Sequence, residues 1–135
     1  MEKQKKVVDA SVIVKWFVQE QFSDKIVDLM EKHSKGEVLL MAPELLFVEV
    51  LNALKYKKVS GNFLAAANKT LWNAQFKIAP LNESLLQKTL AISLKEGLTI
   101  YDSLYVAIAE VENCQMITAD KELYKIPNVV SLEKV

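Results

Sequence analysis

The sequence predicts an α/β fold with a central, mostly parallel β-sheet. Short runs of β-branched and other apolar residues alternate along the chain with longer segments whose apolar residues recur at helical spacing. Glycine, proline and capping residues lie mostly between these segments, where helices and strands are expected to end. Strands that alternate with helices are typical of a parallel sheet built from right-handed crossovers.

Length and composition indicate one globular domain over residues 1–135. The chain is 51% apolar and 25% charged, which is enough to bury a real core. No apolar run approaches the roughly 18 to 20 residues of a membrane span, and the amino end leads into a strand rather than a signal peptide. We therefore expect a cytoplasmic protein without a membrane partner.

The residue counts limit the kinds of site that the chain can build. Its formal charge is zero and every basic residue is lysine, so no global positive field indicates a nucleic-acid binder, although a local basic patch is possible. Cys114 is the only cysteine and His33 the only histidine, which excludes an internal disulfide and a Cys/His zinc cluster. Any metal must then be a hard cation held by carboxylates.

The first element is a buried strand that ends at an acid. Val7 and Val8 precede Asp9, and the apolar residues from Val12 to Val18 predict a short helix after it. In open α/β sheets, ligands bind beyond the carboxyl ends of the strands. Asp9 is therefore either a turn and N-cap residue or part of a site.

The next elements continue the alternation. We expect Ser23 to cap an amphipathic helix that carries His33 on its solvent-exposed side. A buried strand follows over residues 38–41, and Pro43 suits the first turn of a helix. That helix, over residues 44–54, is apolar nearly all round and should be buried.

Two polar residues, Glu49 and Asn52, interrupt this apolar helix on one face. A carboxylate among apolar residues is costly unless it is paired, hydrogen-bonded or bound to metal. Glu49 therefore belongs to a site, or it pairs with a lysine of the basic cluster formed by Lys55, Lys57 and Lys58. These lysines either contact phosphate groups or form a solvated helix end.

The second half of the chain predicts two more helices and two short strands before its last conspicuous motif. The helices are expected over residues 62–76 and 83–96, with a short edge strand at residues 77–81 between them and a last strand at residues 129–130. Trp72 is interpreted as a core or dimer contact rather than a base-stacking platform.

Two further acids follow an expected helix N-cap and an expected strand. Thr99 is the expected N-cap of a helix, and Asp102 in its first turn either completes a capping box or belongs to a site. A short strand begins at Gln115 and ends at Asp120, which either caps a terminal turn or lies at the same sheet edge as Asp9.

The four acids are predicted to converge. In a parallel sheet Asp9 and Asp120 lie at carboxyl ends of strands, while Glu49 and Asp102 lie on helices packed beside that edge. Two carboxylates about 4 Å apart repel by roughly 4 kcal/mol at an effective dielectric of about 20, so a quartet requires cations or raised pKa values. We therefore expect Mg²⁺ or Mn²⁺, with phosphodiester hydrolysis as the matching chemistry.

The chain resembles the PIN-domain ribonucleases, particularly the VapC-type toxins. The resemblance rests on VVDASVIVKWF at residues 7–17, PELLFVEVLNAL at 43–54, TIYDSLYVAIA at 99–109 and ITADKEL at 117–123. Each motif alone is weak, but four in this order are fairly specific and span essentially the whole chain.

The resemblance implies a three-layer α/β/α PIN-like fold and metal-dependent cleavage of RNA. It implies one or two Mg²⁺ or Mn²⁺ ions in an acidic pocket formed by Asp9, Glu49, Asp102 and Asp120. Ser11 and Thr118 occupy the positions of small hydroxyl residues that support this pocket in the family. Family members commonly form homodimers and are often inhibited by a cognate antitoxin protein.

The chemistry suggests how the acids divide the work. We expect Asp9 and Asp102 to bind the principal metal directly, with Glu49 and Asp120 completing the charge and orienting the attacking water. A receiver-like signalling domain would need paired acids at the first strand end and a phosphoacceptor aspartate ending a middle strand, and the sequence supplies neither. A non-catalytic PIN-fold RNA-binding or protein-interaction module is the alternative.

Overall fold

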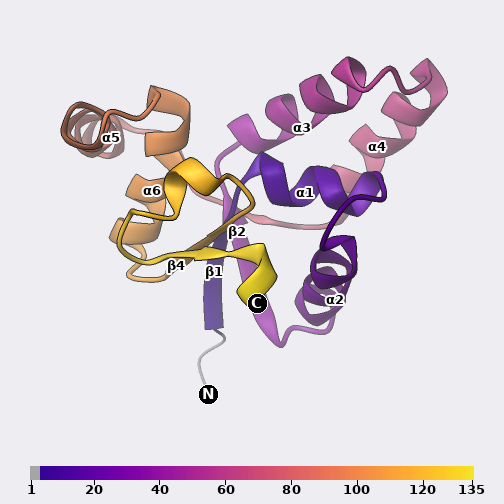
Figure 1. Ribbon diagram of the computed structural model, residues 1–135, viewed down its shortest axis with the longest axis horizontal. Helices are drawn as coiled ribbons and strands as arrows, with labels where there is room; N and C mark the ends of the chain where they lie inside the picture. The colour runs from indigo at the N-terminus through magenta and orange to yellow at the C-terminus, as the bar shows by residue number, and fades with distance from the viewer. Residues whose placement is uncertain (1–3) are drawn as a thin grey trace.

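A five-stranded parallel sheet forms the centre of the protein in the computed structural model, which describes residues 4–135 (Figure 1). The strand order is β3-β2-β1-β4-β5, and each neighbouring pair is parallel. The strands are β1 (Gln4–Val8), β2 (Val38–Ala42), β3 (Lys77–Ile78), β4 (Gln115–Thr118) and β5 (Val129–Ser131). The predicted α/β class with a parallel sheet is confirmed.

Helices cover both faces of the sheet. They are α1 (Ala10–Phe17), α2 (Ser23–Ser34), α3 (Leu45–Tyr56), α4 (Gly61–Asn73), α5 (Glu83–Glu96) and α6 (Ile100–Val111), followed by the 3₁₀ turns η1 (Lys121–Leu123) and η2 (Leu132–Lys134). Figure 1 shows α5 and α6 on one side of the sheet, with α1 and α2 on the other. Helices α3 and α4 pack on each other beside α1. This is the expected α/β/α layering.

The register of the central strands brings two distant parts of the chain to one edge. In the pairing of β1 with β4, Val8 lies opposite Ile117. Asp9 and Thr118 therefore follow as neighbours at the carboxyl ends of these strands. Asp120 comes two residues later, so parallel pairing explains why residues more than a hundred positions apart can share a site.

The core lies where the sheet meets its helices. Val7 and Val8 are completely buried, because the central strand β1 is covered on both faces. In α6 every residue from Ser103 to Ala109 is buried, since this helix packs on β1 and β4 with one side and on α5 with the other. No helix within residues 4–135 has the length and apolar character needed to span a membrane.

Several helices begin as the sequence predicts. The side chains of Asp9, Asn82 and Thr99 each accept a hydrogen bond from the backbone N–H three residues later. Helix α5 ends at Gly97, whose positive φ of 68° suits glycine because it carries no side chain.

The prediction that Ser23 caps α2 is wrong. Phe22 is the N-cap residue, in the left-handed conformation with φ 68°, and Ser23 is the first helical residue. The Ser23 hydroxyl accepts a hydrogen bond from the Glu20 N–H at 2.9 Å and donates to the Val18 carbonyl at 3.2 Å. It therefore holds the connection between α1 and α2.

His33 is partly buried, contrary to its expected place on the solvent-exposed side of α2. Its Nδ1 accepts the Leu40 N–H at 3.1 Å, and its Nε2 lies 2.9 Å from the Ala74 carbonyl oxygen. The ring stacks on Phe76 with a centroid distance of 5.8 Å. Sequence periodicity could not show this, because the partners come from β2 and from the segment after α4.

The pair α3 and α4 is less buried than predicted. Val48 on α3 is 66% exposed, so this helix is not buried all round. Helix α4 ends at Asn73 rather than at residue 76. Trp72 is 54% exposed, and one face of its ring stacks on Phe47 at a centroid distance of 4.1 Å. It is thus a packing residue with an open face rather than a core residue.

Candidate active site

Asp9 is both an N-cap and a buried acid. It is 5% exposed, and its Oδ1 accepts hydrogen bonds from the Ser11 hydroxyl at 2.6 Å and from the Val12 N–H at 3.3 Å. Its Oδ2 accepts the Thr118 hydroxyl at 2.5 Å. The two interpretations left open by the sequence are therefore compatible, because the capping bond also fixes the carboxylate at the sheet edge.

Ser11 and Thr118 tie the two strand ends together. Each hydroxyl donates to Asp9 and accepts a backbone N–H from the turn after β4, Ser11 from Ala119 at 2.9 Å and Thr118 from Asp120 at 3.1 Å. Each hydroxyl thus donates one hydrogen bond and accepts another, which holds the Asp9 carboxylate in place.

Glu49 on α3 is held by a tyrosine rather than by a lysine. The Tyr105 hydroxyl on α6 donates to Glu49 Oε1 at 2.6 Å, and Tyr105 is 1% exposed. The predicted alternative, in which Glu49 pairs with the lysine cluster, is wrong. Lys57 of that cluster instead pairs with Glu20 at 2.6 Å.

Asp102 and Asp120 complete the set from α6 and from the turn after β4. Asp102 lies in the first turn of α6, and its N–H donates to the Thr99 hydroxyl at 3.0 Å. Within residues 4–135 no return bond from the Thr99 N–H to the Asp102 carboxylate is found, so only half of a capping box forms. Asp120 caps η1, with Oδ1 accepting the Glu122 N–H at 3.0 Å.

Three of the four acids have raised pKa values, and the charge of Asp102 contributes to two of these shifts. The pKa of Asp9 is raised to about 6, because burial and, to a smaller extent, the Asp102 charge outweigh the hydrogen bonds from Ser11, Thr118 and Val12. Burial and then the Asp102 charge raise the pKa of Glu49. Burial and then the Asp120 charge raise the pKa of Asp102. Asp102 therefore lies within electrostatic reach of each of the other three acids.

No lysine or histidine within residues 4–135 forms an ion pair with any of these acids. The ion pairs of residues 4–135 all lie elsewhere and include none of the four acids. Asp9 is buried and the other three acids are half-buried. Carboxylates that are shielded from water without a basic partner favour either protonation or an added cation.

The acids are suited to a hard divalent ion that keeps part of its water shell, rather than to an ion enclosed entirely by protein ligands. In the described part of the chain, no three acidic, histidine or cysteine side chains are close enough to form a preassembled metal cluster. Mg²⁺ usually keeps several waters and binds through one or two carboxylates, so it needs no such cluster. The donor set therefore fits Mg²⁺ or Mn²⁺ with water completing the coordination.

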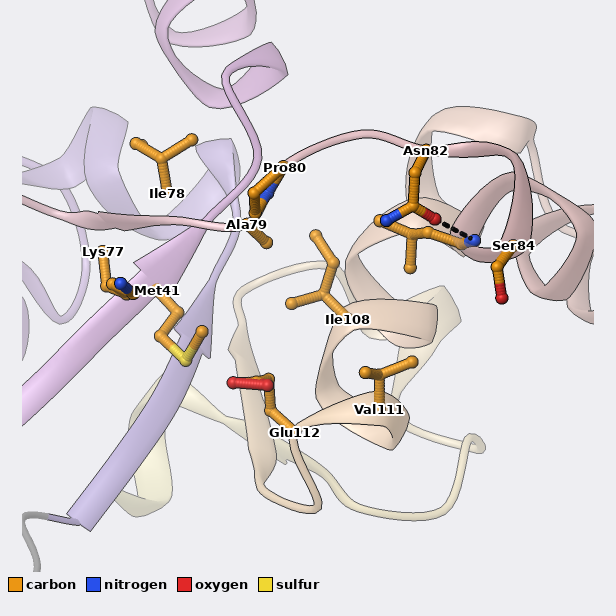
Figure 2. A pocket seen from close by; sticks show the side chains of 11 residues that line it. Met41, Lys77, Ile78, Ala79, Pro80, Asn82, Ser84, Ile108, Val111 and Glu112 are labelled. Carbon is orange, nitrogen blue, oxygen red and sulfur yellow. Dashed lines mark hydrogen bonds between the residues drawn. The ribbon is translucent and has the colours of Figure 1, made fainter.

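An apolar cavity of about 250 Å³ lies away from these acids, beside β3 and the ends of α5 and α6 (Figure 2). The Asn82 carboxamide in its wall is committed to capping α5, since it accepts the Leu85 N–H at 2.8 Å (Figure 2). None of the four acids lines this cavity, so it is not the candidate active site.

Tyr105 is the functional neighbour that sequence reasoning missed. It lies three residues after Asp102 on α6, so both side chains share one helical face. An aromatic residue at helical spacing in an apolar segment normally indicates the core, and Tyr105 is indeed buried. Only the three-dimensional structure shows that the Tyr105 hydroxyl reaches Glu49 on α3.

Comparisons with known proteins find a matching family and a curated relative. A family model described as PIN domain matches residues 6–129. Ribonuclease VapC3 of Pyrobaculum aerophilum is 29% identical over 134 residues, covering 94% of this chain and 98% of the relative.

Solved structures share the fold. VapC20 of Mycobacterium tuberculosis, a sarcin-ricin loop cleaving toxin, superposes with a TM-score of 0.72 at 11% identity over 92% of this chain and 96% of its own. A toxin-antitoxin complex from Klebsiella pneumoniae gives 0.71 at 15% identity over 94% and 97%.

Proposed function

Because the chain belongs to the PIN domain family, we propose that it is a ribonuclease that hydrolyses RNA phosphodiester bonds with Mg²⁺ or Mn²⁺. The observation that carries the proposal is the set of four acids without an ion-pair partner among residues 4–135, Asp9 and Asp120 after β1 and β4, Glu49 on α3 and Asp102 on α6. The relative named Ribonuclease VapC3, similar over nearly its whole length, supports RNA as the substrate.

The acids take different roles according to how they are held. Asp9, fixed by two hydroxyls, and Asp102, coupled to all three other acids, would bind the principal ion. Glu49 and Asp120 would complete the charge through water or a second ion. A bound Mg²⁺ or Mn²⁺ would supply Lewis-acid activation of water and stabilise the negative charge that develops on the phosphate.

The remaining carboxylate oxygens suit the handling of water and protons. Within residues 4–135, Glu49 Oε2 and Asp120 Oδ2 accept no hydrogen bond, whereas the other oxygen of each is occupied by Tyr105 or Glu122. These two free oxygens can orient the attacking water and accept its proton. Tyr105 keeps Glu49 in one orientation for this task.

A metal-restoration experiment tests this proposal. Protein stripped with EDTA should lose cleavage of labelled RNAs and regain it with Mg²⁺ or Mn²⁺, because only oxygen ligands are available. Restoration by Zn²⁺ alone would contradict the metal assignment. Binding without cleavage at every Mg²⁺ and Mn²⁺ concentration would instead favour the non-catalytic PIN-fold module.

The lysine cluster provides a separate prediction. Changing Lys55, Lys57 and Lys58 together to alanine should weaken RNA binding and flatten its salt dependence, since fewer phosphate contacts release fewer counterions. Metal-dependent stabilisation should be unchanged, because these lysines touch none of the four acids. Binding identical to wild type across a salt series would assign the cluster to the solvated surface.

We also propose that this ribonuclease is the toxin of a toxin–antitoxin pair and forms a homodimer in the cytoplasm. The fold shared with a toxin-antitoxin complex supports a protein partner. An apolar stripe on α5 supports a dimer face, because Leu86, Leu90 and Leu94 recur at four-residue spacing and are 36%, 50% and 86% exposed. A small antitoxin-like reading frame beside the gene would support the first assignment.

A further inference from the structure

A groove of about 320 Å³ opens beside the candidate active site, between α1 and α3. Ser11 and Ala119 line it, and the same two residues belong to the hydrogen-bond network that holds Asp9. The groove is therefore continuous with the acidic site, although none of the four acids lines it.

The groove carries one carboxylate between two ammonium groups. Glu20 Oε1 lies 3.6 Å from Lys15 Nζ, and Glu20 Oε2 accepts a hydrogen bond from Lys57 Nζ at 2.6 Å. No other charged side chain of residues 4–135 lines the groove, so these walls carry a net charge of one positive unit. The Lys15 side chain is only 16% exposed, which leaves its charge poorly solvated.

A phosphodiester group matches the charge of this groove, and a nucleic-acid backbone has room to enter it. A single negative charge would neutralise the excess of the two lysines. Ala10, Ala53 and Ala119 lie in the walls, and their small side chains leave room for a nucleic-acid backbone to approach. Lys15 follows Ser11 by one helical turn, about 5 to 6 Å between Cβ atoms, so the groove is a short step from the acids.

We propose that this groove binds a backbone phosphate of single-stranded RNA next to the bond that is cut, with Lys15 and Lys57 as its contacts. Glu20 occupies the place of that phosphate in the free protein and moves aside when RNA binds. This inference rests on the proposed ribonuclease function and adds to it a defined substrate contact.

Glu20 is then a competitor of the substrate. The hydrogen bond from Lys57 lowers the pKa of Glu20, so the carboxylate is ionised at neutral pH and holds both lysines. Its backbone is fixed through the bond from its N–H to Ser23, whereas its side chain is partly exposed and can turn away. A purely structural ion pair would link the same residues but would have no effect on RNA affinity.

Neutral substitutions separate these two roles by the direction of their effects. The Kd of a labelled single-stranded RNA is measured in EDTA, to prevent cleavage, over a series of salt concentrations. Lys15→Gln and Lys57→Gln should each weaken binding roughly fivefold to tenfold at low salt. Each should also reduce the slope of log K against log salt by about 0.7. Glu20→Gln should strengthen binding severalfold, because it removes the competing charge.

Lys88→Gln is the matched control, because Lys88 forms a comparable ion pair with Glu110 at 3.3 Å between α5 and α6, away from the groove. It should leave the Kd and the salt slope unchanged. Thermal melts show which variants are folded. If Lys15→Gln does not fold, the test rests on Glu20→Gln and Lys57→Gln. Both of those side chains are partly exposed, so we expect these variants to fold.

The inference is overturned if Lys57→Gln binds RNA like wild type, or if Glu20→Gln binds no more tightly. If wild-type protein binds and cuts RNA and these variants bind it with the same Kd, only the proposed phosphate contact in the groove is overturned. Wild-type protein that neither binds nor cuts RNA with Mg²⁺ or Mn²⁺ would overturn the proposed function together with this subsite.

Discussion

Asp9→Asn is expected to abolish RNA cleavage and, in EDTA at about pH 8, to raise the free energy of unfolding by roughly 2 kcal/mol. Burial lifts the pKa of this carboxyl from an ordinary 3.8 to about 6, which corresponds to roughly 3 kcal/mol of destabilisation once the group is ionised. Asparagine removes the charge and is an equally good N-cap. About 1 kcal/mol is subtracted because its amide suits only one of the two hydroxyl donors.

The pH dependence follows from the direction of this pKa shift. Between about pH 4 and pH 6 the folded protein retains a proton on Asp9 that the unfolded chain has released. The stability of metal-free wild type should therefore fall as the pH rises through this window. Below about pH 4 the carboxyl is protonated in both states, so the advantage of the variant should disappear.

Chemical denaturation of both proteins in EDTA at several pH values measures this difference. Asp28→Asn is the control, because Asp28 is an exposed acid on α2 that pairs with Lys32 at 3.3 Å. It should follow the wild-type curve. An Asp9→Asn protein that is less stable than wild type at about pH 8 would show that capping and hydrogen bonding outweigh the buried charge.

The contrast between Asp9 and Tyr105 shows what the sequence can and cannot reveal about the site. Asp9, Glu49, Asp102 and Asp120 are conspicuous in the sequence because a carboxylate next to apolar residues contradicts the local pattern. Tyr105 agrees with the pattern of a buried helix, so nothing in the sequence marks its hydroxyl as a partner of Glu49. Residues that break a local rule are visible in the sequence, whereas those that obey it while serving a site are not.

The fold shows the same division. The alternation of strands and helices and the caps at Asp9 and Thr99 depend on residues close in sequence, and the sequence predicts them. His33 and Glu20 depend on distant segments, β2 and α4 for the first and α3 for the second. Helical periodicity placed His33 on the wrong face, because it describes one helix without the elements packed against it.

Asp102→Asn separates the site from the cap by the sign of a stability change. In EDTA the variant should be at least as stable as wild type and inactive, because the charge it removes raises the pKa of Asp9 and of Glu49. If Asp102 served only the cap and the helix dipole, its loss would cost roughly 0.3 to 1 kcal/mol and leave cleavage intact. The backbone bond to Thr99 is kept by asparagine, so it does not disturb this comparison.

Asp24→Asn provides the matched control, since Asp24 is also an acid in a first helical turn but is exposed on α2. It should melt slightly lower and keep full activity. With Mg²⁺ present the order of Asp102→Asn and wild type should invert, because wild type gains RT ln(1 + [L]/Kd) from an ion that the variant binds poorly. Thermal melts with EDTA and with Mg²⁺, beside one RNA cleavage assay, measure all three effects. If Asp102→Asn melts lower in EDTA and still cuts RNA, Asp102 serves only the start of α6. It would then not belong to a metal site with Asp9.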